Sequence, residues 1–327
     1  MSNEANKRAL ARTEWLKSVL GKLPDILPLA GDASFRCYFR VQDKTSSRVL
    51  MDAPPLNEDV RPFLAVRTWM QEAGLRVPDL IAKNTSQGFV LLEDFGDTTW
   101  SVYLSGGHKP DALLEDGFRQ LHLLQAYSRP GMALPAFDLV RMRKECDLYL
   151  DWYLPRVADH IPTPDECLSF YEFLMPYLDK IASLPCAPVH LDYHSRNLML
   201  PEDGLPLGVI DFQDAVHGPV TYDLASLLYD CYQDYPESER LYWSRIFFEA
   251  LQAKFAAAFS DFEAWHDALR LTAMQRHIKA IGIFARLAYR DGKQSFLKEI
   301  PLSRKHLLEE LSFLEIDRAQ IPLLFKQ

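Results

Sequence analysis

The period of the hydrophobic positions changes near residue 95 and divides the chain into two parts. Before that point apolar residues form short runs separated by polar turns, a pattern that predicts strands. The expected strands cover residues 25–29, 35–41, 48–52, 80–83 and 89–93. Helical spacing of apolar positions predicts an opening helix at 4–20 and a second helix at 57–73. The first hundred residues therefore predict a small antiparallel sheet with one main helix.

After residue 97 nearly every segment has helical periodicity, apart from a loop near residue 190 and the hairpin that follows it. We therefore predict an α+β fold with two lobes. A small antiparallel β-sheet lobe with its leading helix would cover residues 1–96, and a larger, mostly helical lobe would cover 97–327. No repeat or long linker separates them, so we expect the lobes to pack around a cleft, the usual place for a small-molecule site.

One loop and the short segment after it carry the strongest chemical signal. The loop reads His190-Leu-Asp-Tyr-His-Ser-Arg-Asn197, and Asp211-Phe-Gln follows fourteen residues later. In phosphoryl transfer, a loop carboxylate meets the substrate hydroxyl, and an Asn five residues on reaches a magnesium ion. A second carboxylate then holds that metal on the nucleotide phosphates. The spacing therefore predicts Asp192 as the catalytic base, with Asn197 and Asp211 as the metal ligands.

The residues between Asn197 and Asp211 predict how these two side chains meet. They form two short apolar segments joined by a Pro-Glu-Asp-Gly turn, which predicts a hairpin. A hairpin would return Asp211 to the side of Asn197. We expect His190 to hold the loop by hydrogen bonds to backbone carbonyls, and we interpret Asp223 as a helix N-cap.

Composition narrows the class of protein. The chain has 327 residues, is 48% hydrophobic and carries a net charge of −9, which fits a globular enzyme and argues against nucleic acid as a partner. Its five cysteines include no C-x-x-C pair, and no apolar stretch is long enough for a signal peptide or a membrane span. We therefore expect a cytoplasmic protein with reduced thiols, no membrane partner and no obligate protein partner.

With these motifs in place, the chain resembles the small-molecule kinases related to aminoglycoside phosphotransferases and choline kinases. Within that group it looks most like the bacterial anomeric kinases of N-acetylmuramate and N-acetylglucosamine. The similar stretches, each quoted by its ends, are His194–Met199, Ile210–Val216, Thr221–Leu228, Gly31–Ser34, Met51–Pro55 and Gln275–Lys279. The resemblance implies an enzyme that uses ATP and Mg²⁺ to make the sugar 1-phosphate during recycling of cell-wall (peptidoglycan) sugars.

The resemblance also implies roles for particular residues. The turn Gly31, Asp32, Ala33 and Ser34 would cover the nucleotide phosphates through backbone N–H groups. Glu93 and Phe95 fall where the hinge between the lobes would meet adenine. His194 and Arg196 could contact phosphate or sugar, or could stabilise the loop.

One departure from the wider kinase pattern concerns the third strand. Kinases place there a lysine that neutralises nucleotide phosphates and pairs with a glutamate of the next helix. Those two positions fall near Met51 and Phe63 in this chain, so both charges are missing. Arg36, Arg40 or additional metal coordination would have to replace the lysine.

The segment 276–293 predicts an amphipathic helix with a basic face. On a helical wheel of about 100° per residue, its basic residues fall within a sector of roughly 80°. They are Arg276, Lys279, Arg286 and Arg290. The face could be a solvated surface, or Arg276 and Lys279 could line the acceptor pocket, where a guanidinium would pair with the lactyl carboxylate of N-acetylmuramate.

Three functions remain open at this point. The first is the ATP-dependent amino-sugar kinase. The second is a kinase of another small hydroxyl compound, such as choline, homoserine or an aminoglycoside, although a basic pocket disfavours cationic acceptors. The third is a nucleotide-binding protein without catalysis, which the missing lysine and glutamate would suggest and the intact Asp192, Asn197 and Asp211 oppose.

Overall fold

A computed structural model describes residues 3–29, 35–44, 46–128 and 133–327. Its first part contains a five-stranded antiparallel sheet with strand order β1-β2-β3-β5-β4. The strands are β1 (Asp25–Pro28), β2 (Cys37–Gln42), β3 (Ser47–Asp52), β4 (Leu80–Asn84) and β5 (Phe89–Glu93). The expected strands are therefore all present, with ends that differ by a residue or two.

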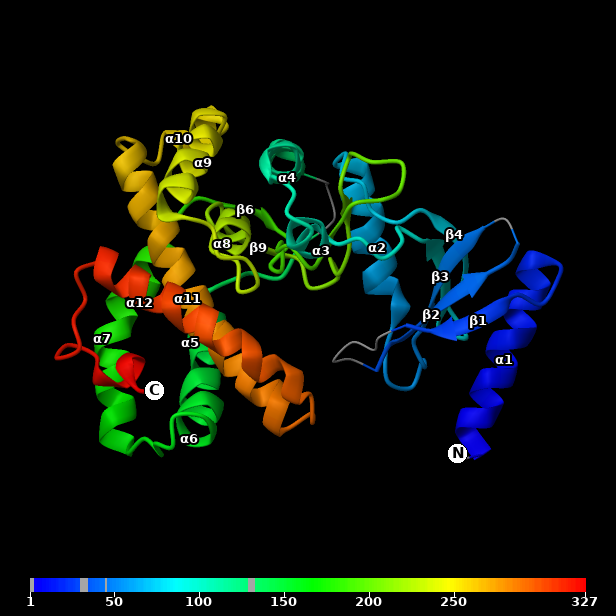
Figure 1. The fold of residues 1–327 in the computed structure, drawn as a ribbon, viewed down its shortest axis with the longest axis horizontal. Coiled ribbons are helices and arrows are strands. Elements are labelled where there is room, and N and C mark those ends of the chain that lie inside the picture. Colours follow the sequence, from blue (N-terminus) through cyan, green and yellow to red (C-terminus); the bar gives the residue numbers. More distant parts are fainter. Residues whose placement is uncertain (1–2, 30–34, 45, 129–132) are drawn as a thin grey trace.

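Two helices cover opposite faces of this sheet. Helix α1 (Asn3–Leu20) lies on the outer face, and α2 (Val60–Glu72) lies between the sheet and the helical part (Figure 1). The alternation of side chains along a strand explains the division. In β3, Leu50 packs with Trp15 of α1, whereas its neighbour Met51 belongs to the core that includes α2.

Helix α2 begins three residues later than its sequence predicts. The backbone nitrogens of Asn57 and Glu58 both bond to the carbonyl of Pro54, which forms a turn before the helix. Asp59 then caps the helix by accepting the backbone N–H of Arg61 at 2.9 Å.

The second part is mostly helical, as its periodicity predicts, and the two-lobed α+β fold is confirmed. Its longer helices are α4 (Asp111–Ala126), α5 (Leu139–Leu148), α7 (Pro164–Ala182), α9 (Glu237–Glu249), α11 (Phe262–Tyr289) and α12 (Ile300–Phe313). Shorter helical segments are α3 (Trp100–Ser105), η1 (Tyr149–Tyr153), α6 (Leu154–Arg156), α8 (Tyr222–Leu228), α10 (Ala253–Ala256), η2 (Gln294–Glu299) and η3 (Pro322–Phe325). The division at residue 96 remains a prediction.

Helix α11 is the centre of the helical lobe. It packs against α5, η1, α8 and α12 (Figure 1). Its approach to α5 depends on Gly282, because a Cβ atom there would lie 2.4 Å from the carbonyl carbon of Leu148. The helix was predicted only from residue 276, and it actually begins fourteen residues earlier, at Phe262.

Two small ribbons near the middle of the molecule carry the loop residues. Strands β6 (Cys186–Val189) and β9 (Val216–Pro219) form one pair, and β7 (Leu198–Met199) and β8 (Gly208–Val209) form the other. The second pair is the predicted hairpin between Asn197 and Asp211. Among the helices of the described residues, none is long and apolar enough to span a membrane.

Candidate active site

A buried carboxylate fixes the backbone of the loop that carries Asp192. Asp223, at the start of α8, accepts the backbone N–H groups of His190 at 2.7 Å and Leu191 at 3.0 Å. Leu191 has a φ of 82°, a left-handed conformation that is costly for a residue with a Cβ and persists only where the surroundings enforce it. The interpretation of Asp223 as a helix N-cap is therefore wrong, since Thr221 precedes the helix and Asp223 binds the loop.

His190 stabilises the same loop, as its sequence position predicts. Its buried ring bonds through Nε2 to the carbonyl of Ile210 at 3.0 Å and through Nδ1 to the backbone N–H of Asp192 at 3.3 Å. Burial lowers the pKa of His190 to about 4, so the ring is neutral at physiological pH and Nδ1 can accept the second bond.

The Asp192 carboxylate lies in the wall of a cavity lined by several cations. Burial by itself would raise the pKa of Asp192, but the positive charges of Lys279 and Arg276 are among the causes that bring it below its ordinary value. The carboxylate is therefore ionised at neutral pH and can accept a proton from a hydroxyl group.

Asn197 and Asp211 lie side by side, as the predicted hairpin requires. The Nδ2 atom of Asn197 donates to the backbone carbonyl of Asp192 at 3.0 Å and lies 3.4 Å from Oδ2 of Asp211. Gln213 donates to the other carboxylate oxygen of Asp211 at 2.7 Å. Asp211 itself has a φ of 63°, a second strained backbone position in the site.

The donor set at Asn197 and Asp211 suits magnesium. Among the described residues, no group of three or more His, Cys, Asp or Glu side chains could hold a metal by itself. Magnesium needs no such cage, because it commonly binds one or two protein oxygens and completes its shell with water and substrate phosphates. The amide oxygen of Asn197 and the Asp211 carboxylate fit that requirement.

Two cavities meet at these residues. The first, here called the cleft cavity, has a volume of about 580 Å³ and lies between the sheet and the hairpin. The second, the inner cavity, has a volume of about 320 Å³ and includes Asp192 and residues of α11. Arg196, Asn197 and Asp211 line both cavities. A molecule in one cavity would therefore meet a molecule in the other at the predicted metal site.

The cleft cavity contains both residues that were expected at the hinge. Glu93 and Phe95 line it, and the Phe95 ring packs so closely on Gly208 that a Cβ atom there would lie 2.4 Å from the ring. Arg40 of β2 also lines this cavity. The expected phosphate turn, Gly31 to Ser34, falls outside the described residues.

The inner cavity combines a cationic part with an apolar wall. All four residues predicted to contact the acceptor line it: His194, Arg196, Arg276 and Lys279. The apolar wall consists of Ala280, Ile283, Phe284, Leu287 and Phe296. A ligand here would meet charged donors on one side and a surface suited to a methyl or ring carbon on the other.

Two of these cations are buried instead of forming a solvated face. Arg276 and Lys279 expose 5% and 8% of their surfaces, and the opposite side of α11, with Ile278 and Ile281, is buried as well. The solvated interpretation is therefore wrong for this pair, because α11 runs through the lobe. Lys279 lies 3.5 Å from Glu145 of α5 and bonds to the Tyr222 hydroxyl at 3.2 Å.

Arg196 and His194 both contact Tyr232, a tyrosine that lines the inner cavity. The Arg196 guanidinium lies 3.7 Å from the centre of the Tyr232 ring and donates to Glu299 at 2.6 Å. The His194 ring meets Tyr232 edge to face, with 5.1 Å between ring centres. The Nδ1 atom of His194 is buried and has no hydrogen-bond partner among the described residues.

Sequence reasoning missed the two carboxylates that pair with Lys279 and Arg196, and it missed the loop-binding role of Asp223. Glu145, Asp223 and Glu299 come from α5, α8 and η2, and Gln213 completes the set by orienting Asp211. Glu145 precedes Lys279 by more than a hundred residues, and no local pattern indicates their contact. For Asp223, its place just before an apolar helix suggested a different and more common role.

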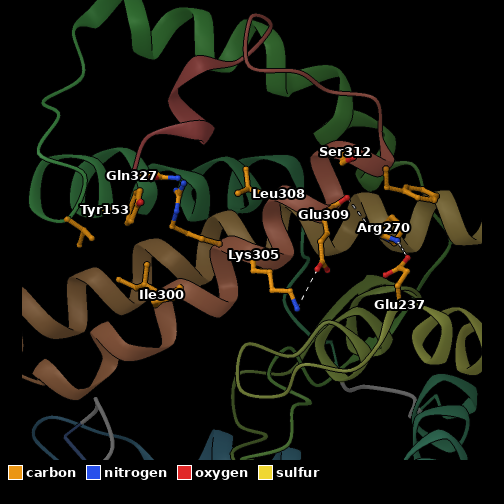
Figure 2. A pocket seen from close by; sticks show the side chains of 13 residues that line it. Tyr153, Glu237, Arg270, Ile300, Lys305, Leu308, Glu309, Ser312 and Gln327 are labelled. Carbon is orange, nitrogen blue, oxygen red and sulfur yellow. Dashed lines mark hydrogen bonds and ion pairs between the residues drawn. The ribbon is translucent and has the colours of Figure 1, made fainter.

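A larger cavity of about 1000 Å³ lies elsewhere in the helical lobe, between α11, α12 and the end of the chain (Figure 2). Its wall contains two ion pairs, Lys305 with Glu309 at 3.7 Å and Arg270 with Glu237. None of the predicted site residues lines it. The chemistry inferred from the loop therefore belongs to the cleft and inner cavities.

This arrangement defines a two-lobed phosphotransferase, and comparison with known families agrees. The model of the phosphotransferase enzyme family matches residues 25–270. The chain belongs to this family. A phosphotransferase of this kind acts on a small-molecule hydroxyl group and generally uses a nucleotide with a divalent metal.

Individual relatives agree with the family assignment. The chain is 38% identical to an N-acetylmuramate/N-acetylglucosamine kinase of Pseudomonas aeruginosa, covering 90% of this chain and 89% of the relative. It is 36% identical to the protein of the same description from Neisseria meningitidis, covering 90% and 88%. The solved choline kinase LicA of Streptococcus pneumoniae shares the fold, with a TM-score of 0.64 at 12% identity over 92% and 99% of the two chains.

Proposed function

We propose that this protein transfers the γ-phosphoryl group of ATP to the anomeric hydroxyl of N-acetylmuramate or N-acetylglucosamine. The observation that carries the proposal is the meeting of two cavities at Arg196, Asn197 and Asp211, with Asp192 on the inner side. ATP would occupy the cleft cavity and the sugar the inner cavity. The names of the relatives support an N-acetylated amino sugar as the acceptor.

The charge of the inner cavity supports the same class of acceptor. Arg196, Arg276 and Lys279 line it together with the carboxylates of Asp192 and Asp211. Glu145 and Glu299 pair with Lys279 and Arg196 from outside this lining, so the charges nearly balance and give a cationic acceptor such as choline or an aminoglycoside no strong attraction. A neutral sugar or one that carries a carboxylate suits this cavity, and its apolar wall suits an acetyl methyl group.

The residues would divide the reaction between positioning and proton transfer. Asp192 would accept the proton of the sugar hydroxyl as the oxygen attacks the γ-phosphorus, and the bond to the ADP oxygen would break. Asn197 and Asp211 would hold Mg²⁺, which when bound neutralises charge on the phosphates. His190 and Asp223 would keep the loop in the geometry that this step requires.

The test is a measurement of ADP release with ATP and magnesium. The acceptors are N-acetylmuramate, N-acetylglucosamine, glucosamine, choline, homoserine and kanamycin. Turnover with the N-acetylated sugars, with phosphorus NMR showing a 1-phosphate, is the expected result. Asp192→Asn should lower turnover by roughly 10² to 10⁴, the usual contribution of a general base.

Other outcomes would replace the proposal. Turnover with choline, homoserine or kanamycin alone would assign a different acceptor. ATP binding without ADP release on any acceptor would favour the nucleotide-binding protein without catalysis. Normal turnover by Asp192→Asn would remove Asp192 from its proposed role.

A further inference from the structure

The positions that hold the lysine and glutamate of other kinases are apolar in this protein. Met51 and Phe63 belong to one buried core cluster, and the Phe63 ring stacks on Phe212, next to Asp211, with 5.0 Å between ring centres. A triphosphate carries several negative charges, so the cleft cavity needs cations besides magnesium. The cations of its wall, Arg40 and Arg196, lie among the carboxylates of Glu93, Asp94, Asp97 and Asp211.

Arg40 does not meet this need, because its donors are committed to the hinge. Its Nε bonds to Asp94 at 2.7 Å, and its Nη1 bonds to Asp97 at 2.9 Å. Its Nη2 bonds to Asp94 and to the carbonyl of Gly96, both at 3.2 Å. Two carboxylates thus balance one guanidinium, and Arg40 connects β2 to the segment that joins the lobes.

Arg36, unlike Arg40, pairs with a carboxylate that lies just before α2. It precedes β2 by one residue, and its side chain donates to one carboxylate oxygen of Glu58 through Nε at 3.1 Å and Nη2 at 2.6 Å. Its guanidinium lies 6.0 Å from the centre of the Phe63 ring and interacts with Tyr38, and both of those residues line the cleft cavity.

Tyr38 connects Arg36 with the position of the missing lysine. Tyr38 is the cross-strand partner of Met51, and its hydroxyl lies 3.6 Å from the Met51 sulfur. Arg36 comes two residues before Tyr38, and its guanidinium lies 6.0 Å from the ring centre of Phe63, which belongs to the same core cluster as Met51. The stacked rings of Phe63 and Phe212 then extend from Arg36 toward Asp211.

We propose that Arg36, oriented by its ion pair with Glu58, binds the phosphate chain of ATP in place of the missing lysine. Glu58 comes just before α2 and acts as the positioning carboxylate. A guanidinium presents five N–H donors in a planar fork and can bond to a carboxylate and a phosphate together. The inference rests on the proposed use of ATP, and it does not depend on which sugar is the acceptor.

The test compares ligands with and without phosphates. Calorimetry would give the dissociation constants of ATP, ADP and adenosine, with magnesium, for wild type, Arg36→Met, Arg36→Lys and Glu58→Gln. Loss of a hydrogen bond to a charged group predicts that Arg36→Met weakens ATP binding roughly 10- to 100-fold. Adenosine binding should not change. Arg36→Lys should lose less ATP affinity than Arg36→Met. In steady-state kinetics, Glu58→Gln should raise the KM for ATP without raising the KM for the acceptor.

A matched control is available on α2. Arg61 likewise pairs with a carboxylate, that of Asp59, but 79% of its side chain is exposed, so the Arg61→Met protein should bind every ligand with the affinity of wild type. The proposal fails if Arg36→Met leaves ATP affinity unchanged or weakens adenosine to the same degree. Circular dichroism shows whether Arg36→Met is folded. If it is not, Arg36→Lys and Glu58→Gln take its place. The proposal is then overturned if both of these variants keep the wild-type ratio of ATP affinity to adenosine affinity. Failure of wild type to phosphorylate any sugar would contradict the proposed acceptor alone, since ATP binding is measured separately.

Discussion

The carboxylate of Asp223 lies 2.7 Å from the backbone nitrogen of His190, and this contact joins α8 to the loop that carries Asp192. The same carboxylate accepts the N–H of Leu191, whose backbone is left-handed. The Asp223 side chain is only 1% exposed, and burial raises its pKa to about 7 even though the two N–H donors favour the charged form. The cost of burying this group is offset by the two hydrogen bonds with which it fixes a strained loop.

Asp223→Asn should destabilise the protein and lower turnover together. The oxygen of the new Asn side chain can accept one of the two backbone N–H groups. Its NH₂ group would face the other N–H, so buried donors would be left without acceptors. We expect a loss of about 1–3 kcal/mol in the free energy of unfolding. Urea unfolding measures the first effect, and ADP release measures the second. Asp267→Asn, on the exposed side of α11, is the control, and equal behaviour of the two variants would contradict the role of Asp223.

Stability should depend on pH through His190. The pKa of about 4 in the folded protein is below the ordinary value of 6.5, so the unfolded chain binds a proton that the folded protein refuses. The stabilisation is complete above pH 6.5 and is lost as the pH falls toward 4. Linkage gives a loss of about 2 kcal/mol between pH 7.5 and pH 5.

The measurement is urea unfolding of wild type and His190→Asn across that pH range. The variant will be less stable at every pH because it loses the bond to Ile210, so only the slope with pH is compared. A shallower slope in the variant, by about 2 kcal/mol over the range, is expected. Identical slopes would show that the pKa of His190 is the same in the folded and the unfolded protein, so that its burial does not lower it.

The close contact of Gly282 with the Leu148 backbone predicts that two glycine-to-alanine substitutions will differ in their effect on stability. Gly282→Ala should be destabilising by about 1–3 kcal/mol, since its Cβ would overlap backbone atoms that cannot easily move. Gly117 in α4 is the matched helical control, because its added Cβ would lie 3.3 Å from the Trp100 ring and no nearer to any backbone atom. Thermal unfolding should show little change for Gly117→Ala. A normal melting temperature for Gly282→Ala would mean that α5 and α11 can separate.

Local patterns account for the parts of the fold that the sequence predicts. Strands alternate between two faces, and both the 190–197 loop and its hairpin lie within one short segment, so Asn197 and Asp211 could be paired without long-range information. The loop-stabilising role of His190 could be predicted because His190 belongs to the same short segment.

Contacts between distant segments account for the errors. The wheel of residues 276–293 separates basic from apolar positions correctly, but it cannot reveal that α5 and Tyr222 cover the basic side of α11. A buried lysine is rare enough that solvent is the ordinary expectation. The partner that permits its burial, Glu145, is far away in the sequence. Likewise, Arg36 and Arg40 are equivalent candidates in the sequence, and only the positions of Glu58, Asp94 and Asp97 distinguish them.

The last prediction concerns how the inner cavity would distinguish its two proposed sugars. N-acetylmuramate differs from N-acetylglucosamine by a lactyl group with a carboxylate, and Arg196 is the most exposed of the three cations in the cavity wall, with 38% of its side chain accessible. We expect Arg196→Gln to lower kcat/KM for N-acetylmuramate roughly 10- to 100-fold, the loss for one hydrogen bond to a charged group. The value for N-acetylglucosamine should change little.

Steady-state kinetics with both sugars decides between this role and a role at the phosphoryl group. Arg196 also lines the cleft cavity, so equal losses with the two sugars would show that it contacts the transferred phosphoryl group instead of the carboxylate. Lys298→Gln is the control, because Lys298 neighbours Glu299 at 3.9 Å with 72% of its side chain exposed. Glu299→Gln should have the opposite effect to Arg196→Gln. Without the Glu299 carboxylate, the Arg196 guanidinium can pair with the substrate carboxylate, so the preference for N-acetylmuramate should increase.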